Sequence, residues 1–189
     1  VSSQVISFAA FSKHHPDGKV LRGPHGGYGR NPYVGYDSNQ NPFLYRGDVD
    51  DRLFATARVL AITLDGSSIA YPFHVLQSAH VINDTVSDTD LVIFWEEGAA
   101  SALDASDIDS SKDVGMAVMY NRKLPTGEVL SFHYEDGVFH DKQTNSTWNI
   151  FGEAITGDLK GQTLKQLNAF PHFWFAWAAF YPDTLVYQP

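Results

Sequence analysis

Hydrophobic and polar positions alternate with the two-residue period of β-strands over much of the chain after residue 57. Residues 58–64 and 69–71 are two such segments, and Asp65-Gly66 between them is a dipeptide typical of tight hairpin turns. Residues 91–95 form an uninterrupted apolar run, which predicts a strand buried on both faces. Further short strands are predicted at residues 116–120, 129–134 and 147–150, the first two as an antiparallel pair joined through Pro125-Thr126-Gly127.

Three short segments are expected to be helical. Residues 6–15 have a helix-like apolar pattern that ends before Pro16, and residues 73–79 form a second candidate. The third, residues 173–180, is rich in tryptophan and phenylalanine, and because it is apolar all round we expect it to be buried. Together these patterns predict a β-rich α+β fold, with an antiparallel barrel- or sandwich-like core and a few short peripheral helices.

Two segments at opposite ends of the chain resemble each other. Residues 6–21 align without gaps on residues 172–187, and the alignment pairs Phe8 with Trp174 and Phe11 with Trp177. Each copy is an aromatic helix, a Pro-Asp turn and an extended exit, which predicts a tandem protein. We therefore assign three regions: the tail end of a preceding repeat (1–21), an ordered aromatic loop rich in Gly and Pro (22–57) and a β-rich repeat domain (58–189), with 22–189 folding as one unit.

The composition narrows the classes of protein to which the chain can belong. It has 189 residues, of which 43% are hydrophobic and 19% charged, and this balance is typical of a globular domain. The net charge of −9 argues against nucleic acid as a partner. The absence of cysteine excludes disulfides, thiolate metal sites and cysteine nucleophiles. No transmembrane segment is expected, and because the chain begins with Val1, any targeting signal is expected upstream.

Six short motifs follow one another along the chain. They are residues 28–37 (YGRNPYVGYD), 70–72 (AYP), 81–86 (VINDTV), 101–104 (SALD), 144–148 (TNSTW) and 173–184 (FWFAWAAFYPDT). In this combination the chain resembles the domain-of-unknown-function 3179 family over nearly its whole length. The resemblance implies a prokaryotic, extracytoplasmic protein (periplasmic, cell-surface or secreted) with two repeats, of which this chain is the C-terminal one.

The chain departs from that family at one motif. Other repeats of the family have a histidine before an Asn-Asp pair, followed after the next strand by a Cys-Pro-Leu-Cys-like motif. His80, Asn83 and Asp84 stand at the first of these positions, but Trp95 and Gly98 occupy the places of the cysteines. The resemblance therefore implies a cysteine-free variant, in which a thiol-based redox or copper role is not expected.

Two groups of residues are candidates for metal binding. A transition-metal site needs converging imidazoles and carboxylates, and His80, His140 and Asp141 are the candidates, with His133 as a further imidazole. Calcium needs clustered oxygen atoms instead, and these are offered by Asp104, Asp107, Asp109 and Asp113. The second group lacks the glycine and glutamate of an EF-hand loop, and solvated acidic turns with helix caps explain the same residues. Calcium or another divalent metal is the cofactor that these residues could hold.

Candidate ligand-binding residues lie on one loop and one strand. In the aromatic loop, Arg30, Tyr36 and Asp37 could clamp a carboxylate or stack on a planar ligand, although the alternative of an internal brace is favoured. His80, Asn83 and Asp84 form the second group. Their alternative role is to stabilise a turn or cap a helix by hydrogen bonds from the side chains to the backbone.

No catalytic residues are assigned, because the chain has neither a Gly-x-Ser-x-Gly elbow nor a phosphate-binding loop. The leading hypothesis is an exported, non-catalytic binding or structural module that contacts an upstream repeat of the same protein or another exported protein. The alternative is a protein that binds a metal or a small ligand. A weaker alternative is a carbohydrate-active hydrolase with a carboxylate pair, in which Glu96 would be desolvated at a strand end and Trp148 or Trp174 would stack on a sugar.

Overall fold

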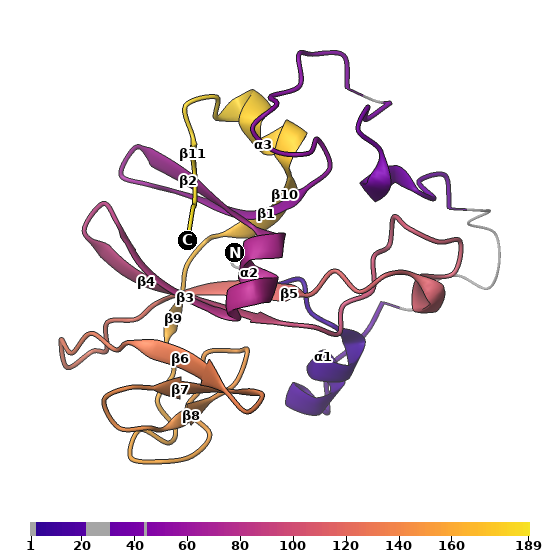
Figure 1. The fold of residues 1–189 in the computed structure, drawn as a ribbon. Coiled ribbons are helices and arrows are strands. Elements are labelled where there is room, and N and C mark those ends of the chain that lie inside the picture. Colours follow the sequence, from indigo (N-terminus) through magenta and orange to yellow (C-terminus); the bar gives the residue numbers. More distant parts are fainter. Residues whose placement is uncertain (1–2, 22–30, 44) are drawn as a thin grey trace.

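The computed structural model describes residues 3–21, 31–43 and 45–189, and its strands form three sheets (Figure 1). The first sheet has the order β10-β1-β2-β11, with the bounds Phe170–Phe173, Arg58–Leu64, Ser67–Pro72 and Leu185–Val186. The second has the order β3-β4-β5-β9, with the bounds Val81–Val86, Thr89–Glu96, Met116–Asn121 and Lys165–Gln166. The third has the order β6-β7-β8, with the bounds Phe132–Glu135, Val138–Asp141 and Thr147–Trp148. The pairs between these strands are antiparallel except β11 with β2, so the predicted β-rich α+β fold is confirmed in its sandwich-like form.

The sheets are layered, and the second sheet lies between the other two (Figure 1). One of its faces contributes Ile93 and Met119 to a core shared with the first sheet. Its other face contributes Phe94 and Tyr120 to a core shared with the third sheet. Residues 91–95 are all buried, so the prediction of a strand buried on both faces is confirmed.

The three helices each have seven residues. They are α1 (Phe8–His14), α2 (Phe73–Ala79) and α3 (Trp174–Phe180), and two short 3₁₀ turns lie at Tyr36–Ser38 and Ile108–Ser110. Helix α3 covers the outer face of the first sheet, where Trp174 and Trp177 pack on Val59 and Ala61. The prediction that this helix is buried holds for that face and is wrong for Phe180, which is 83% exposed. A helix lying on a sheet turns one side to it, and the other side faces solvent.

One predicted strand pair is wrong. Residues 116–120 belong to β5, which pairs with β4 and β9, and residues 129–134 do not pair with them. A single bridge joins Val129 to Lys123, which follows β5. Strand β6 pairs instead with β7 through the turn Asp136-Gly137. Both turn residues have positive φ, which is the geometry that the Asp-Gly dipeptide favours. The chain crosses from the second sheet to the third after the bridge, and this crossing separates the two segments.

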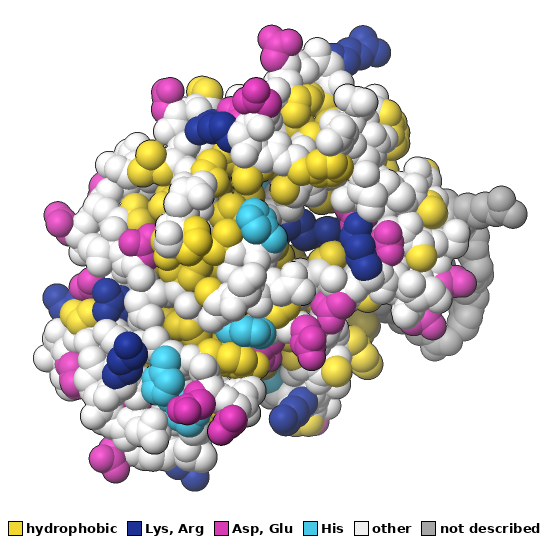
Figure 2. Space-filling view, viewed as in Figure 1, with side chains coloured by type: hydrophobic (Ala, Val, Ile, Leu, Met, Phe, Trp, Pro, Cys, Tyr) yellow, Lys and Arg dark blue, Asp and Glu magenta, His cyan; other side chains and the backbone are white. Residues whose placement is uncertain are grey.

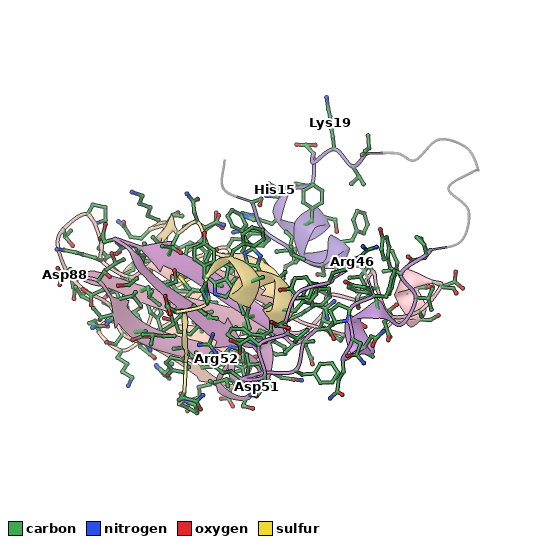
Figure 3. The ribbon with its side chains drawn as sticks, turned by 90° about the horizontal axis from the view of Figure 1, so that it is seen from above. His15, Lys19, Arg46, Asp51, Arg52 and Asp88 are labelled. Carbon is green, nitrogen blue, oxygen red and sulfur yellow. The ribbon has the colours of Figure 1, made fainter. Side chains whose placement is uncertain are left out.

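The N-terminal segment lies against the second and third sheets. The Ser7 side chain caps α1 by accepting a hydrogen bond from the backbone N–H of Ala10, and the Gln4 amide donates to the Tyr120 hydroxyl at 3.2 Å. No residue of α1 is buried. After the helix the segment extends away from the sheets, and Lys19 points outward (Figure 3).

Two surface properties complete the description. Acidic and basic side chains are interspersed over the face drawn in Figure 2. Of the helices in the described ranges, none has the length and apolar character needed to cross a bilayer.

Candidate functional site

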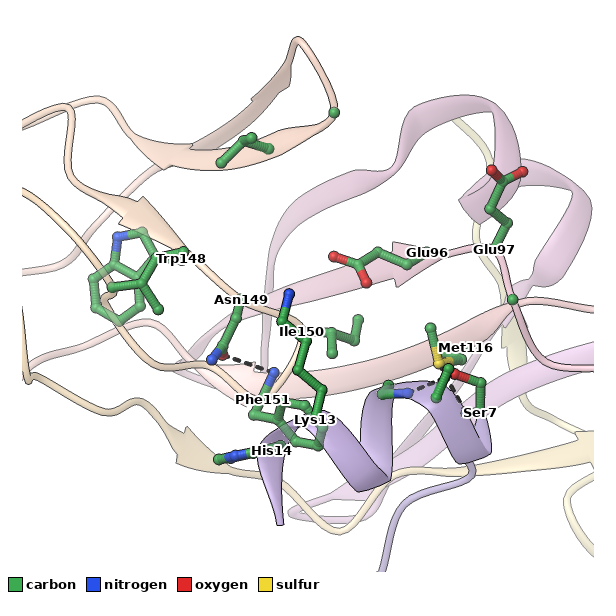
Figure 4. A pocket seen from close by; sticks show the side chains of 16 residues that line it. Ser7, Lys13, His14, Glu96, Glu97, Met116, Trp148, Asn149, Ile150 and Phe151 are labelled. Carbon is green, nitrogen blue, oxygen red and sulfur yellow. Dashed lines mark hydrogen bonds between the residues drawn. The ribbon is translucent and has the colours of Figure 1, made fainter. Parts of the chain in front are cut away.

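A cavity of about 730 Å³ lies where α1 approaches the end of β4 and the segment that follows β8 (Figure 4). Its apolar walls include Ala10 on α1, Met116 on β5, and Ile150 and Phe151 after β8. Its charged lining residues are Lys13, His14, Glu96 and Glu97. The cavity thus combines apolar walls with a few ionisable groups, as binding sites for small molecules do.

Glu96 is the last residue of β4, and its side chain enters this cavity. It follows Phe94 on the same face of the strand, the face that packs against the third sheet, and Val138 of β7 and Trp148 of β8 line the cavity with it. In Figure 4 its carboxylate points toward the segment from Asn149 to Phe151, whereas Glu97 points away. Burial raises the pKa of Glu96, and the positive charge of Lys13 offsets this only in part. Within the described ranges, no hydrogen bond or ion pair reaches the Glu96 carboxylate.

The wall opposite Glu96 is held by hydrogen bonds. The Asn149 side-chain oxygen accepts from the backbone N–H groups of Phe151 and Glu153, each at 3.0 Å. The Trp148 indole donates to Asp141 at 3.0 Å. On the other side of Phe151, the His14 ring lies 3.9 Å away between centroids, and its Nε2 is 3.4 Å from Glu153. Contacts between α1 and this segment therefore fix the distance across the cavity.

A second group of charges surrounds Asp37, whose side chain is fully buried. Arg58 Nη1 lies 3.1 Å and Lys112 Nζ 3.0 Å from its carboxylate, and Ser101 donates a short hydrogen bond to it. Burial raises the pKa of Asp37, but the hydrogen bonds from Ser101, Lys112 and Arg58 outweigh it, so the pKa lies below its ordinary value. The carboxylate joins the 31–43 loop to β1 and to the loop after β4.

The family comparison covers both of these sites. Residues 1–184 match the model of a family described as "Protein of unknown function (DUF3179)". The chain belongs to this family. This confirms the family that the six motifs indicated. No curated protein and no solved structure matches the chain.

In this DUF3179 chain, the loop residues predicted to bind a ligand contact other parts of the protein. Tyr36 is 9% exposed and packs edge-on against Phe43, with ring centroids 5.1 Å apart. Asp37 is occupied by Arg58 and Lys112, as described above. Arg30, the third member of the predicted set, lies outside the described residues. Tyr36 and Asp37 thus help to hold the 31–43 loop in place, and the brace expected of Arg30 falls outside the described residues.

The second predicted group, at α2 and β3, is divided between two faces. Asn83 donates to the Phe132 carbonyl and accepts from the Phe132 N–H, both at 2.8 Å, which links β3 to β6. Asp84 accepts from the Tyr71 hydroxyl at 2.8 Å. His80 ends α2 with a φ of 58°, and its ring stacks on Tyr134 at 4.2 Å. The structure does not bring these three side chains to one point.

The predicted imidazole ligands are also separated. His140 faces His133 across β6 and β7, with ring centroids 5.3 Å apart. Asp141 is fully buried on the opposite face, where it accepts hydrogen bonds from Thr144 and Trp148. His80 contacts Tyr134, which alternates with His133 along β6 and so lies on the other face.

In the acidic loop, two of the four aspartates bind backbone. Asp104 accepts from the Lys112 N–H at 2.8 Å, and Asp113 accepts from the N–H groups of Gly98 and Gly115. Asp107 precedes the 3₁₀ turn at Ile108–Ser110, Asp109 lies within it, and both are exposed. Across the described ranges, no group of three or more His, Asp or Glu side chains is arranged to hold a metal ion.

Sequence reasoning singled out Glu96 and Trp148, which line the cavity, but missed the residues that other segments contribute to it. Lys13, Met116 and Phe151 lie far apart along the chain, and they share no spacing or motif that would connect them. The feature of the sequence that pointed to this cavity was local: an ionisable residue directly after a strand predicted to be buried.

Proposed function

We propose that this DUF3179 chain is a non-catalytic module that binds a small organic ligand in the cavity beneath α1. The observation that carries the proposal is the 730 Å³ cavity with apolar walls and one partly buried carboxylate. General acid–base catalysis needs a group within reach of the transferred proton and a second group positioned to act with it on the substrate. Glu96 has no such partner among the described residues, and Glu97 beside it is exposed. Binding therefore accounts for the site better than catalysis does.

Blocking the cavity tests this function. A ligand-observed NMR screen is run with small aromatic molecules that carry cationic, neutral or anionic groups. We expect binders of the wild-type chain to compete for one site and to lose binding in Ala10→Trp, because the indole fills space that Ala10 leaves open. Ser12→Trp is the matched control, since Ser12 is exposed on the same helix and does not line the cavity. Binding that survives in Ala10→Trp, or no binder at all, contradicts the proposal.

We also propose that the module is the C-terminal repeat of a tandem, extracytoplasmic protein and contacts the preceding repeat through residues 6–21. Helices α1 and α3 support this, because they have the same length and matching ends. The residues before them have φ/ψ of −67°/152° and −77°/144°, and the residues after them −121°/72° and −131°/68°. In both helices the following N–H bonds to the carbonyl four residues back, of Phe11 or Trp177.

The two copies differ in what they cover. In the C-terminal copy, Trp174 is buried on the first sheet and β11 pairs with β2. In the N-terminal copy the aligned Phe8 is 70% exposed, and Val20, aligned with Val186 of β11, is 62% exposed. An aromatic helix followed by an extended segment, both with exposed apolar side chains, is suited to pack on a second sheet of the same kind. The cavity, whose roof is α1, would then lie at the boundary between two repeats, a common location for ligand sites.

Sequencing the reading frame upstream of Val1 checks the repeat proposal. We expect a second strand-rich segment with hairpin and strand signals equivalent to residues 58–71, because residues 6–21 need a sheet to cover. An upstream frame without such a segment would show that residues 6–21 have another role.

A further inference from the structure

The cavity contains a negative charge that the described part of the protein leaves without a counterion. Arg58 and Lys112 are engaged with Asp37, Arg122 with Asp90, and Arg52 with Asp50. Lys13 lines the cavity, but its side chain is exposed and makes no ion pair with Glu96. The carboxylate therefore stands in a partly desolvated position, and Lys13 stabilises it only through its charge, without an ion pair.

Desolvation without a partner raises the free energy of the ionised carboxylate. The protein can relieve this by protonating Glu96, and the raised pKa of Glu96 reflects that tendency. A bound cation relieves it as well, because an opposite charge within a few ångströms favours the ionised form. The nearby charge of Glu97 adds to the attraction for a cation. Burial raises the pKa of Tyr134, and the charges of both glutamates raise it further.

The walls around Glu96 specify the rest of such a ligand. Met116, Ile150 and Phe151 offer apolar surface, and Phe151 presents an aromatic ring. A small inorganic cation would leave this surface unused, and Glu96 is not part of any cluster of three metal-ligating side chains in the described ranges. An organic cation with an apolar body uses both features.

We propose that the cavity binds an organic ammonium compound, with the amine at the Glu96 carboxylate and an apolar, preferably aromatic, body against Phe151, Ile150 and Met116. This rests on the proposed function, because it names the ligand class of the same cavity.

Three probes of one shape test the ligand class. Phenethylamine, phenethyl alcohol and hydrocinnamate share a phenyl ring on a two-carbon chain and carry a cationic, a neutral and an anionic head. In isothermal titration calorimetry at neutral pH, we expect phenethylamine to bind at least about tenfold more tightly than either of the others. Glu96→Gln should remove that advantage, and Glu128→Gln, at an exposed glutamate that does not line the cavity, should change it by no more than about threefold.

Proton release is an independent signature of the same contact. The ionisable groups near Glu96 are Lys13 and His14 on α1, Glu97 directly after β4, and Tyr134 on β6. The His80 ring stacks on Tyr134. Because the pKa of Glu96 is raised in the free protein and falls beside an ammonium, binding releases a proton when Glu96 is protonated beforehand. Affinity for phenethylamine should therefore fall as the pH drops through the pKa of free Glu96. In Glu96→Gln this dependence should disappear, while in the control Glu128→Gln it should remain.

The outcomes separate the two proposals. Phenethyl alcohol or hydrocinnamate binding as tightly as phenethylamine, with all of them lost in Ala10→Trp, overturns the ammonium proposal and leaves a ligand site. Phenethylamine binding that is unchanged in Glu96→Gln also overturns it. If none of the three probes binds the wild-type chain, both the ammonium proposal and the proposed function fail.

Discussion

Replacing Trp174 by alanine is expected to lower the free energy of unfolding by about 3–5 kcal/mol. The indole is fully buried on the first sheet, and its N–H donates to the Asp50 carbonyl at 3.1 Å. The Arg52 guanidinium lies 5.0 Å above the ring. Truncation removes these contacts and leaves a cavity between α3 and the sheet. Equilibrium urea denaturation, followed by tryptophan fluorescence and circular dichroism, measures the change.

The same helix supplies the control for this substitution. Phe180 is 83% exposed at the other end of α3, so Phe180→Ala is expected to change the free energy of unfolding by no more than about 0.5 kcal/mol. Equal effects of the two substitutions would show that α3 does not pack through Trp174.

Replacing Asp37 by alanine is expected to lower the free energy of unfolding by about 3 kcal/mol at neutral pH. The substitution leaves Arg58 and Lys112 without their shared carboxylate, and the Arg58 side chain is only 18% exposed. It also removes the acceptor of the Ser101 hydroxyl. Urea denaturation of Asp37→Ala, Asp37→Asn and wild type measures the effect. Asp109→Ala is the control, because Asp109 is an exposed aspartate of the neighbouring acidic loop.

Asp37 also predicts how stability depends on pH. Its pKa in the folded protein lies below the ordinary value of 3.8, because the hydrogen bonds that it accepts outweigh the effect of burial. The stabilisation is therefore fully present above about pH 4 and is lost as the pH falls through the folded-state pKa. In Asp37→Asn this part of the acid sensitivity should be absent. Identical acid-unfolding curves for the variant and the wild type would show that the carboxylate is not ionised in this cluster.

Local patterns predicted local structure well. The hairpin of β1 and β2 follows from alternation around Asp65-Gly66, and α2 spans the predicted residues 73–79. Residues 91–95 were correctly predicted to be buried on both faces. Each of these features depends on neighbours within a few residues, so its signal is present in a short window of sequence.

Pairings over longer distances were less predictable. The pattern of residues 129–134 is that of a strand, but alternation does not say which sheet the strand joins, and the Asp136-Gly137 turn that pairs it with β7 was overlooked. For the same reason, His140 and Asp141 were plausible metal ligands by residue type. Alternation along β7 places their side chains on different faces.

The sequence by itself determined the family, the β-rich class, the main hairpin and the repetition of the aromatic helix at the two ends of the chain. It also marked Glu96 as an ionisable residue at the end of a buried strand. The three-dimensional arrangement was needed to show that Asp37 has two cationic partners while Glu96 has none among the described residues, and that α1 closes a cavity over Glu96. The physical reason is that the free energy of a carboxylate depends on the charges, donors and solvent within a few ångströms of it. In this protein those neighbours come from segments far apart along the chain.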